Sequence, residues 1–132
     1  MSSKKNTEPS TDVTESIMPP ALDHNMLKDL DKIMGYDMRV LLIQEFITYA
    51  PPQLATLQQI FNAGDTEALW HKAHQFKGEC LQIGANQLGI LCQNLETSAK
   101  NGQLKLMSAT LDKLQTELAR LKKTVSSFGE QL

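Results

Sequence analysis

His74, Lys77 and Gly78 stand at offsets of zero, three and four along one stretch of the chain, and their types suit chemistry on phosphorus. A neutral imidazole has a ring nitrogen that acts as a nucleophile near neutral pH. An ammonium group one helical turn away attracts an anionic group and offsets charge on transferring oxygens. Glycine inside a helix costs about 1 kcal/mol relative to alanine, so it needs a reason. Clearance beside the imidazole for a bulky protein partner is such a reason.

These three residues fall on the outer side of a helix predicted over residues 65 to 83. Asp65 opens this helix, and Gly84 marks the turn after it. On a helical wheel, five apolar side chains form one core stripe, namely Leu69, Ala73, Phe76, Cys80 and Ile83. His74 lies on the opposite side of the helix, so we predict an exposed imidazole.

Four further residues share or border the predicted solvent side of this helix. Trp70 and Leu81 flank His74, and we predict that they form an apolar rim where a partner docks. Glu67 lies on the same side. His71 has no evident partner and is interpreted as solvated, or at most peripheral to docking. The predicted docking surface therefore comprises Trp70, His71, Leu81 and Glu67.

Simpler explanations of the same residues stay open at this point. Gly78 would equally permit a neighbouring helix to pack closely, and Trp70 would equally be buried at the edge of a bundle. A single surface histidine is most often only solvated. A zinc site made of His71, His74 and Cys80 is rejected, because Cys80 faces the core and no fourth ligand is evident.

The remaining apolar pattern predicts the elements that position this helix. Asp23 caps a short helix that ends before Gly35, and Asp37 is expected to cap the next one. Pro51-Pro52 makes that helix either kinked near Ala50 or two abutting helices. The expected helical segments are residues 23–34, 37–63, 65–83, 85–100 and 104–125, the last with an inward seam from Leu104 to Val125. These patterns predict an all-α fold, an antiparallel four-helix bundle with a short additional N-terminal helix.

Length and composition limit the other choices. The 132 residues suffice for one domain, and 41% hydrophobic with only 5% aromatic residues favours helices over strands. We expect a disordered leader over 1–18, the bundle over 19–127 and a frayed end over 128–132. A net charge of −2 gives no reason to expect nucleic acid, and no apolar run is long enough for a membrane span. We therefore expect a soluble, cytoplasmic protein with Cys80 and Cys92 as core residues.

The motif around His74 resembles the signature of histidine-containing phosphotransfer (Hpt) domains, the middle relays of multistep two-component signalling. The resemblance extends over about residues 22 to 125. The residues that carry it are Ala73-His74, Lys77-Gly78, Gly84-Ala85, Leu88, Cys92 and Leu95-Glu96. One departure is Glu79-Cys80, where the family more often has small residues.

The resemblance implies a function and a set of partners. His74 would accept a phosphoryl group from a receiver-domain aspartate of a hybrid sensor kinase and pass it to the aspartate of a response regulator. Lys77 would assist electrostatically, Gly78 would permit approach, and Glu96 would either orient the imidazole or be solvated. The chain would be a monomeric carrier rather than an enzyme, without a cofactor or metal of its own, because Mg²⁺ is expected on the receiver. The alternative is a helical adaptor, a degenerate Hpt domain, that binds a signalling partner without being phosphorylated.

Overall fold

A computed structural model describes residues 19–131, so the expected leader over residues 1–18 lies outside the described part of the chain. Helices make up nearly all of residues 19–131, and no strand occurs among them. The helices are α2 (His24–Met34), α3 (Tyr36–Asn62), α4 (Thr66–Gln82), α5 (Asn86–Lys100) and α6 (Leu104–Gln131). None of them is long and apolar enough to cross a membrane within the described residues.

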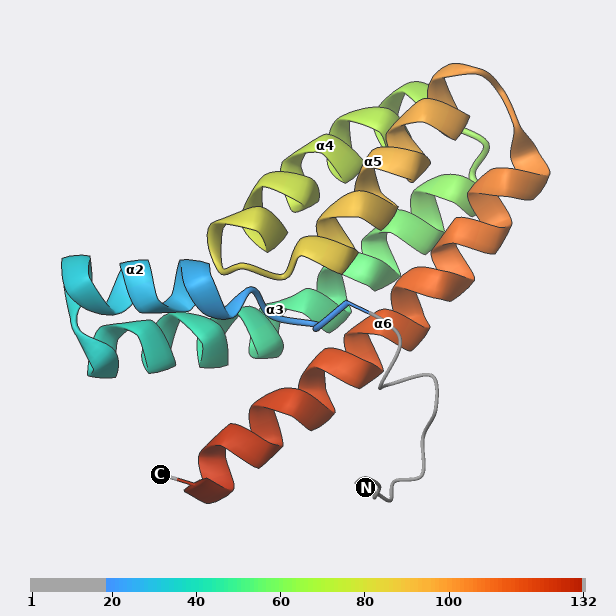
Figure 1. Cartoon of the computed structure of the whole chain (residues 1–132). Coiled ribbons are helices and arrows are strands. Elements are labelled where there is room, and N and C mark those ends of the chain that lie inside the picture. Colours follow the sequence, from blue (N-terminus) through green and yellow to red (C-terminus); the bar gives the residue numbers. More distant parts are fainter. Residues whose placement is uncertain (1–18, 132) are drawn as a thin grey trace, which may run out of the picture.

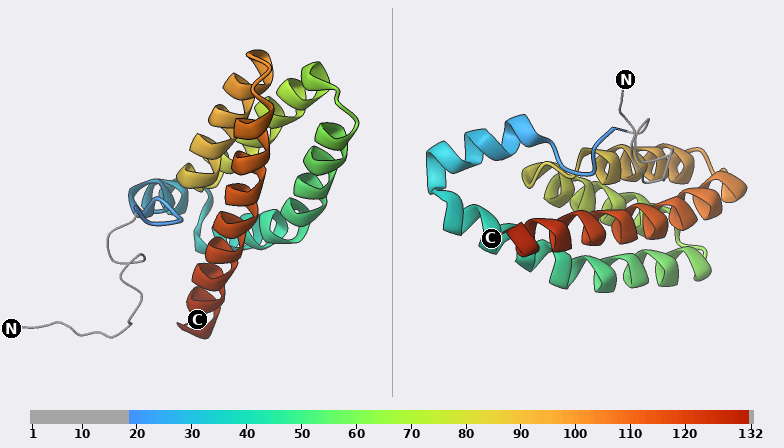
Figure 2. Two further views of the ribbon diagram at one scale, coloured as in Figure 1. Left: turned by 90° about the vertical axis from the view of Figure 1, so that its right-hand side faces the viewer. Right: turned by 60° about the horizontal axis from the view of Figure 1, so that its bottom comes forward.

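Helices α3 to α6 form the predicted antiparallel four-helix bundle (Figures 1 and 2). Each helix packs on the helix that follows it in the chain, and α6 closes the ring by packing on α3. Helices α4 and α6 therefore lie on a diagonal, and an exposed residue of α6 faces away from α4. The additional helix α2 packs on the first half of α3, beyond the end of α4 and α5.

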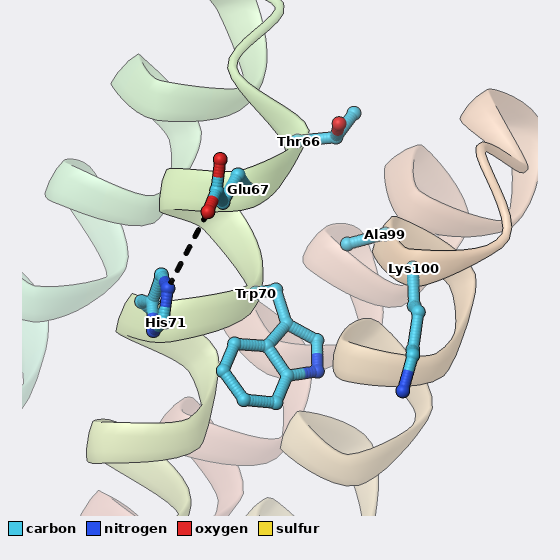
Figure 3. Close-up of a pocket in the computed structure, with 6 residues that line it drawn as sticks. All are labelled: Thr66, Glu67, Trp70, His71, Ala99 and Lys100. Carbon is cyan, nitrogen blue, oxygen red and sulfur yellow. Dashed lines mark ion pairs between the residues drawn. The ribbon is translucent and has the colours of Figure 1, made fainter.

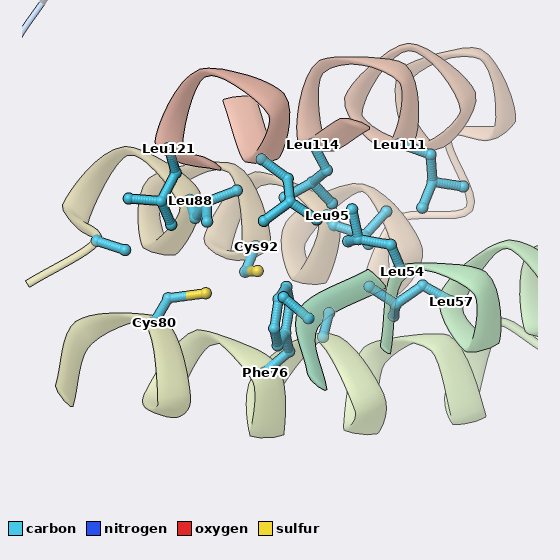
Figure 4. Close-up of a cluster of buried hydrophobic side chains, with 14 of the residues drawn as sticks. Leu54, Leu57, Phe76, Cys80, Leu88, Cys92, Leu95, Leu111, Leu114 and Leu121 are labelled. Carbon is cyan, nitrogen blue, oxygen red and sulfur yellow. The ribbon is translucent and has the colours of Figure 1, made fainter. Parts of the chain in front are cut away.

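One continuous core fills the bundle (Figure 4). All five residues of the stripe predicted for α4 are buried, as predicted, and so are the two cysteines, which are free thiols. The neighbouring Cys92 thiol, together with burial, raises the pKa of Cys80 far above its usual range. This thiol therefore behaves as a small apolar core group rather than as a nucleophile. The largest fully buried side chains include Leu22, before α2, and residues from all four bundle helices: Leu54, Leu57, Leu69, Phe76, Leu88, Leu95, Met107, Leu114 and Leu121.

Pro51 and Pro52 lie inside one continuous helix rather than between two. A proline lacks the backbone donor for the carbonyl one turn earlier and clashes with it, so a helix bends there. In Figures 1 and 2, the first part of α3 runs beside α2 and the later part turns into the bundle. The bend therefore lets α3 pack on α2 with its first part and join the four-helix bundle with its later part.

Three details differ from the sequence-based expectations. Helix α3 begins at Tyr36 with Gly35 as its N-cap, so Asp37 is not the cap; Gly35 takes a φ of 84°, and no side chain caps the helix. Leu104 is exposed rather than part of the α6 seam, because it is the first residue of the helix and lies beyond the core. The backbone of α6 stays helical to Gln131, past residue 125, where the sequence pattern predicted the helix to end.

The turn between α4 and α5 is tied to the start of the described chain. Gly84 has a φ of 81°, a conformation that favours glycine, and its carbonyl accepts a hydrogen bond from the Asp23 backbone N–H at 2.8 Å. The Asp23 carboxylate caps α2 through the Met26 N–H and also accepts from Asn86 Nδ2 at 3.0 Å. These hydrogen bonds hold the pKa of Asp23 below its usual value. The turn that sets the register of α4 against α5 is thereby fixed.

Candidate functional site

His74 lies on the outer side of α4, as the wheel predicted, and 60% of its side chain is exposed. The inner face of its helix packs on the core, because Ala73 and Phe76, before and after His74 in the chain, are completely or almost completely buried. The helix begins at a local cap, the Asp65 carboxylate accepting from the Ala68 N–H at 3.0 Å. A capped and well-packed helix thus presents the imidazole to solvent in a fixed place.

Glu96 of α5 reaches His74 from the neighbouring helix. Its Oε1 lies 3.0 Å from His74 Nδ1, and only 6% of its side chain is exposed. Of the two roles left open by the sequence, a solvated Glu96 is therefore wrong. A carboxylate accepts but does not donate a hydrogen bond, so Nδ1 carries the proton in this pair. In the neutral ring, the nitrogen on the far side, Nε2, is then the one with a free electron pair.

Lys77 also contacts Glu96, one turn further along α4. Its Nζ donates a hydrogen bond to Gln93 Oε1 at 2.8 Å and also lies 2.8 Å from Glu96 Oε2, an ion-pair contact in which Oε2 accepts no hydrogen bond. The side chain is only 20% exposed. The single buried carboxylate therefore bridges the imidazole and the ammonium, one oxygen to each.

Gly78 is exposed, and a Cβ built on it would meet no atom within 4 Å. The explanation that this glycine lets a neighbouring helix pack closely is therefore wrong. The open space next to the imidazole belongs to solvent in the isolated chain.

Trp70 is partly buried, and its ring stacks on the imidazole of His74, with centroids 5.5 Å apart and planes 6° from parallel. On its other side it borders an open cleft between α4 and α5 of about 380 Å³, in which Thr66, Glu67, Ala99 and Lys100 also take part (Figure 3). His71 stands edge-on to Trp70 and 4.0 Å from Glu67, so it has neighbours that the sequence did not reveal. Together these residues form a surface that continues directly from His74.

Leu81 lies at the opposite end of this surface and is partly exposed. Its side chain covers Gly89 of α5, where an added Cβ would lie 2.6 Å from Leu81 Cδ2. Gly89 thus allows Leu81 to lie across α5 instead of pointing away from it. Gly89 is not among the site residues predicted from the sequence.

The close contact between Leu81 and Gly89 makes a testable prediction. Replacing a helical glycine with alanine normally gains about 1 kcal/mol of stability. We expect Gly89→Ala to gain clearly less, because Leu81 must move away from the new methyl group. Urea denaturation of Gly89→Ala alone and with Leu81→Ala measures the difference. An equal gain in both backgrounds would show that the contact is unimportant.

A single register of α4 against α5 brings together the three pairs of residues described above. His74 with Glu96, Lys77 with Gln93, and Leu81 with Gly89 are each equidistant along the chain from Ala85, the N-cap of α5. Successive pairs follow at three or four residues, as neighbouring positions on one helix face do. The surface is therefore built by two antiparallel helices that fold back about the turn at Gly84-Ala85.

The described residues contain no group of three or more His, Cys, Asp or Glu side chains that is arranged to hold a metal ion. Cys80 faces the core while His71 and His74 face solvent, so these three residues do not converge. The site consists of one nucleophilic ring and the charged and polar groups around it.

Comparisons with known proteins agree with this geometry. Residues 41–124 match the family model of the Hpt domain. The crystal structure of histidine-containing phosphotransfer protein B (HptB) from Pseudomonas aeruginosa PAO1 is similar with a TM-score of 0.79. The identity is 30%, and the match covers 87% of this chain and 99% of that chain. A search of curated proteins gave no significant match.

Proposed function

This chain belongs to the Hpt domain family, and from that premise we propose that it relays phosphoryl groups between proteins on Nε2 of His74. A phosphotransfer role in general follows from the family. The proposal adds the accepting atom and the partners. The donor is an aspartyl phosphate on the receiver domain of a hybrid sensor kinase, and the recipient is the receiver aspartate of a response regulator. The carrier acts as a monomer and has no turnover of its own.

The contact between His74 and Glu96 is the observation that supports this proposal most strongly. With Nδ1 occupied at 3.0 Å by a buried carboxylate, the imidazole presents Nε2 outward with its electron pair free. A histidine that is merely solvated has no need of a buried charged partner, since burying a carboxylate is unfavourable unless it is paired. The exposed face of the ring then meets whatever docks on α4 and α5.

The proposed transfer is an in-line displacement with balanced charges. The Nε2 electron pair attacks phosphorus, the P–O bond to the aspartyl group breaks, and the receiver regains its carboxylate. The positive charge that develops on the ring is stabilised at Nδ1–H by Glu96. The same steps in reverse pass the group to the second receiver. Mg²⁺ on the receiver is expected to supply the charge on the other side of the phosphoryl group.

Glu96→Gln tests the role of the carboxylate. Glutamine keeps the shape and an accepting oxygen but removes the charge. A hydrogen bond to a charged group contributes about 1.5–3 kcal/mol, so we expect transfer to slow about tenfold to a hundredfold. Rapid-quench kinetics with a phosphorylated receiver measure this rate. An unchanged rate would show that Glu96 does not act in transfer.

A phosphotransfer assay with a radiolabelled receiver tests the function itself. The proposal expects acid-labile, base-stable label to pass from the receiver to this chain. A folded chain that takes no label from any of several receivers would favour the adaptor alternative instead. Circular dichroism on the same samples establishes that the chain is folded.

A further inference from the structure

The position of Lys77 suggests a different role from the direct assistance that the sequence implies. Its ammonium lies between two oxygens, Glu96 Oε2 and Gln93 Oε1, each 2.8 Å away. Only 20% of the side chain is exposed, against 60% for His74. Lys77 is therefore held down in the groove between α4 and α5 rather than extended toward solvent.

The buried carboxylate of Glu96 creates an electrostatic problem that Lys77 can solve. With 6% of its side chain exposed, Glu96 is poorly screened by water. Alone, its negative charge would repel the phosphoryl group, which also arrives as an anion. An ammonium in contact with Oε2 neutralises the carboxylate, while Oε1 remains aimed at the imidazole.

We propose that Lys77 acts through Glu96, by balancing the charge of the carboxylate and fixing its orientation on His74, and that Gln93 holds Lys77 in that place. This inference rests on the proposed function of His74. It makes Lys77 and Gln93 positioning residues. Gln93 is suited to its part because its neutral amide oxygen accepts from the ammonium without adding a second negative charge.

A double-mutant cycle separates this role from direct contact with the phosphoryl group. Lys77→Met keeps most of the apolar stem and removes the ammonium. We expect it to slow transfer about tenfold in the wild-type background and less than about threefold in the Glu96→Gln background. In the second background no charge remains to be balanced. Equal slowing in both backgrounds would overturn the proposal. A lysine that binds the phosphoryl oxygens directly would contribute the same factor to the transfer rate whether or not Glu96 is charged.

Equilibrium unfolding of the same four proteins gives a readout that does not depend on transfer. Lys77→Met should lower the urea midpoint, because it removes the ammonium from a buried carboxylate and leaves only the contact with His74. Adding Glu96→Gln should restore much of that loss. If the wild-type chain takes no label, the proposed function fails, while this cycle still decides whether Lys77 balances Glu96. If Lys77→Met and Glu96→Gln change the urea midpoint additively, Lys77 does not balance the charge of Glu96.

Gln93→Ala tests the second positioning residue. The side chain is exposed, and alanine is a good helix former, so we expect α5 to stay intact. Transfer should slow about threefold because the ammonium becomes mobile, and the effect should vanish in the Lys77→Met background. Asn94→Ala, at the next and equally exposed position of α5, is the matched control and should leave the rate unchanged. A Gln93→Ala rate equal to this control would remove Gln93 from the proposal.

Discussion

Replacing His74 with glutamine is expected to abolish phosphorylation while leaving the fold intact. Glutamine has no ring nitrogen to attack phosphorus, so no label should be taken up from any receiver. Because 60% of the side chain is exposed and it lies outside the core, the free energy of unfolding should change by no more than about 1 kcal/mol. Phosphotransfer and urea denaturation on one preparation measure both quantities.

The other two histidines provide controls for this prediction. His24 begins α2, far along the chain from the site, and His24→Gln should be labelled like the wild type. His71 lies beside Trp70 on the proposed docking surface, so His71→Gln should still take label even if docking changes. Label retained on His74→Gln, or lost only on His71→Gln, would show that the acceptor has been assigned to the wrong ring.

Gly78→Gln is expected to have opposite effects on stability and on transfer. A glycine inside a helix is destabilising, and a new side chain here meets no atom of the chain, so the variant should unfold at higher urea concentration. The same side chain would stand one turn from the imidazole, in space that the proposed partner would occupy. Reacting atoms must approach to about 3–3.5 Å, and small displacements cost about a hundredfold, so we expect a loss of that order in the second-order rate constant for transfer from the receiver.

Two variants serve as controls for the clearance effect. Gly78→Ala adds only a methyl group, and it should gain stability with a much smaller loss of transfer. Ala119→Gln makes a similarly long side chain at an exposed position of α6, the helix diagonal to α4, and should transfer like the wild type. Normal transfer by Gly78→Gln would show that the partner does not need this space.

The apolar pattern of the sequence sufficed to predict the parts of the site that depend on a single helix. The α4 stripe from Leu69 to Ile83 is buried as predicted, and that alone places His74 on the outside. The same wheel placed Gly78 on the outer side, but it left open whether a neighbouring helix packs there, and the structure shows open space. Such predictions succeed because the period of a helix fixes which side chains share a face.

What the sequence analysis missed depends on how two helices meet. Gln93 and Gly89 acquire their roles only through the register of α5 against α4, which folds back about Ala85. The Gly84-Ala85 turn could have predicted the contact between Lys77 and Gln93. These two residues are the same number of positions from Ala85, so they face each other when the two helices fold back about the turn. The stacking of Trp70 on His74 had no comparable signal, because it depends on the rotamers of both side chains.

We expect the phosphoryl group on Nε2 of His74, with Nδ1 of the same ring facing Glu96. NMR of the phosphorylated chain with isotopically labelled histidine rings tests this most directly, because the coupling to phosphorus identifies both the residue and the nitrogen. We expect a proton on Nδ1 of His74 before transfer and phosphorus on Nε2 of the same ring after it. Phosphorus on Nδ1, on another residue or on no residue of a folded chain would contradict it.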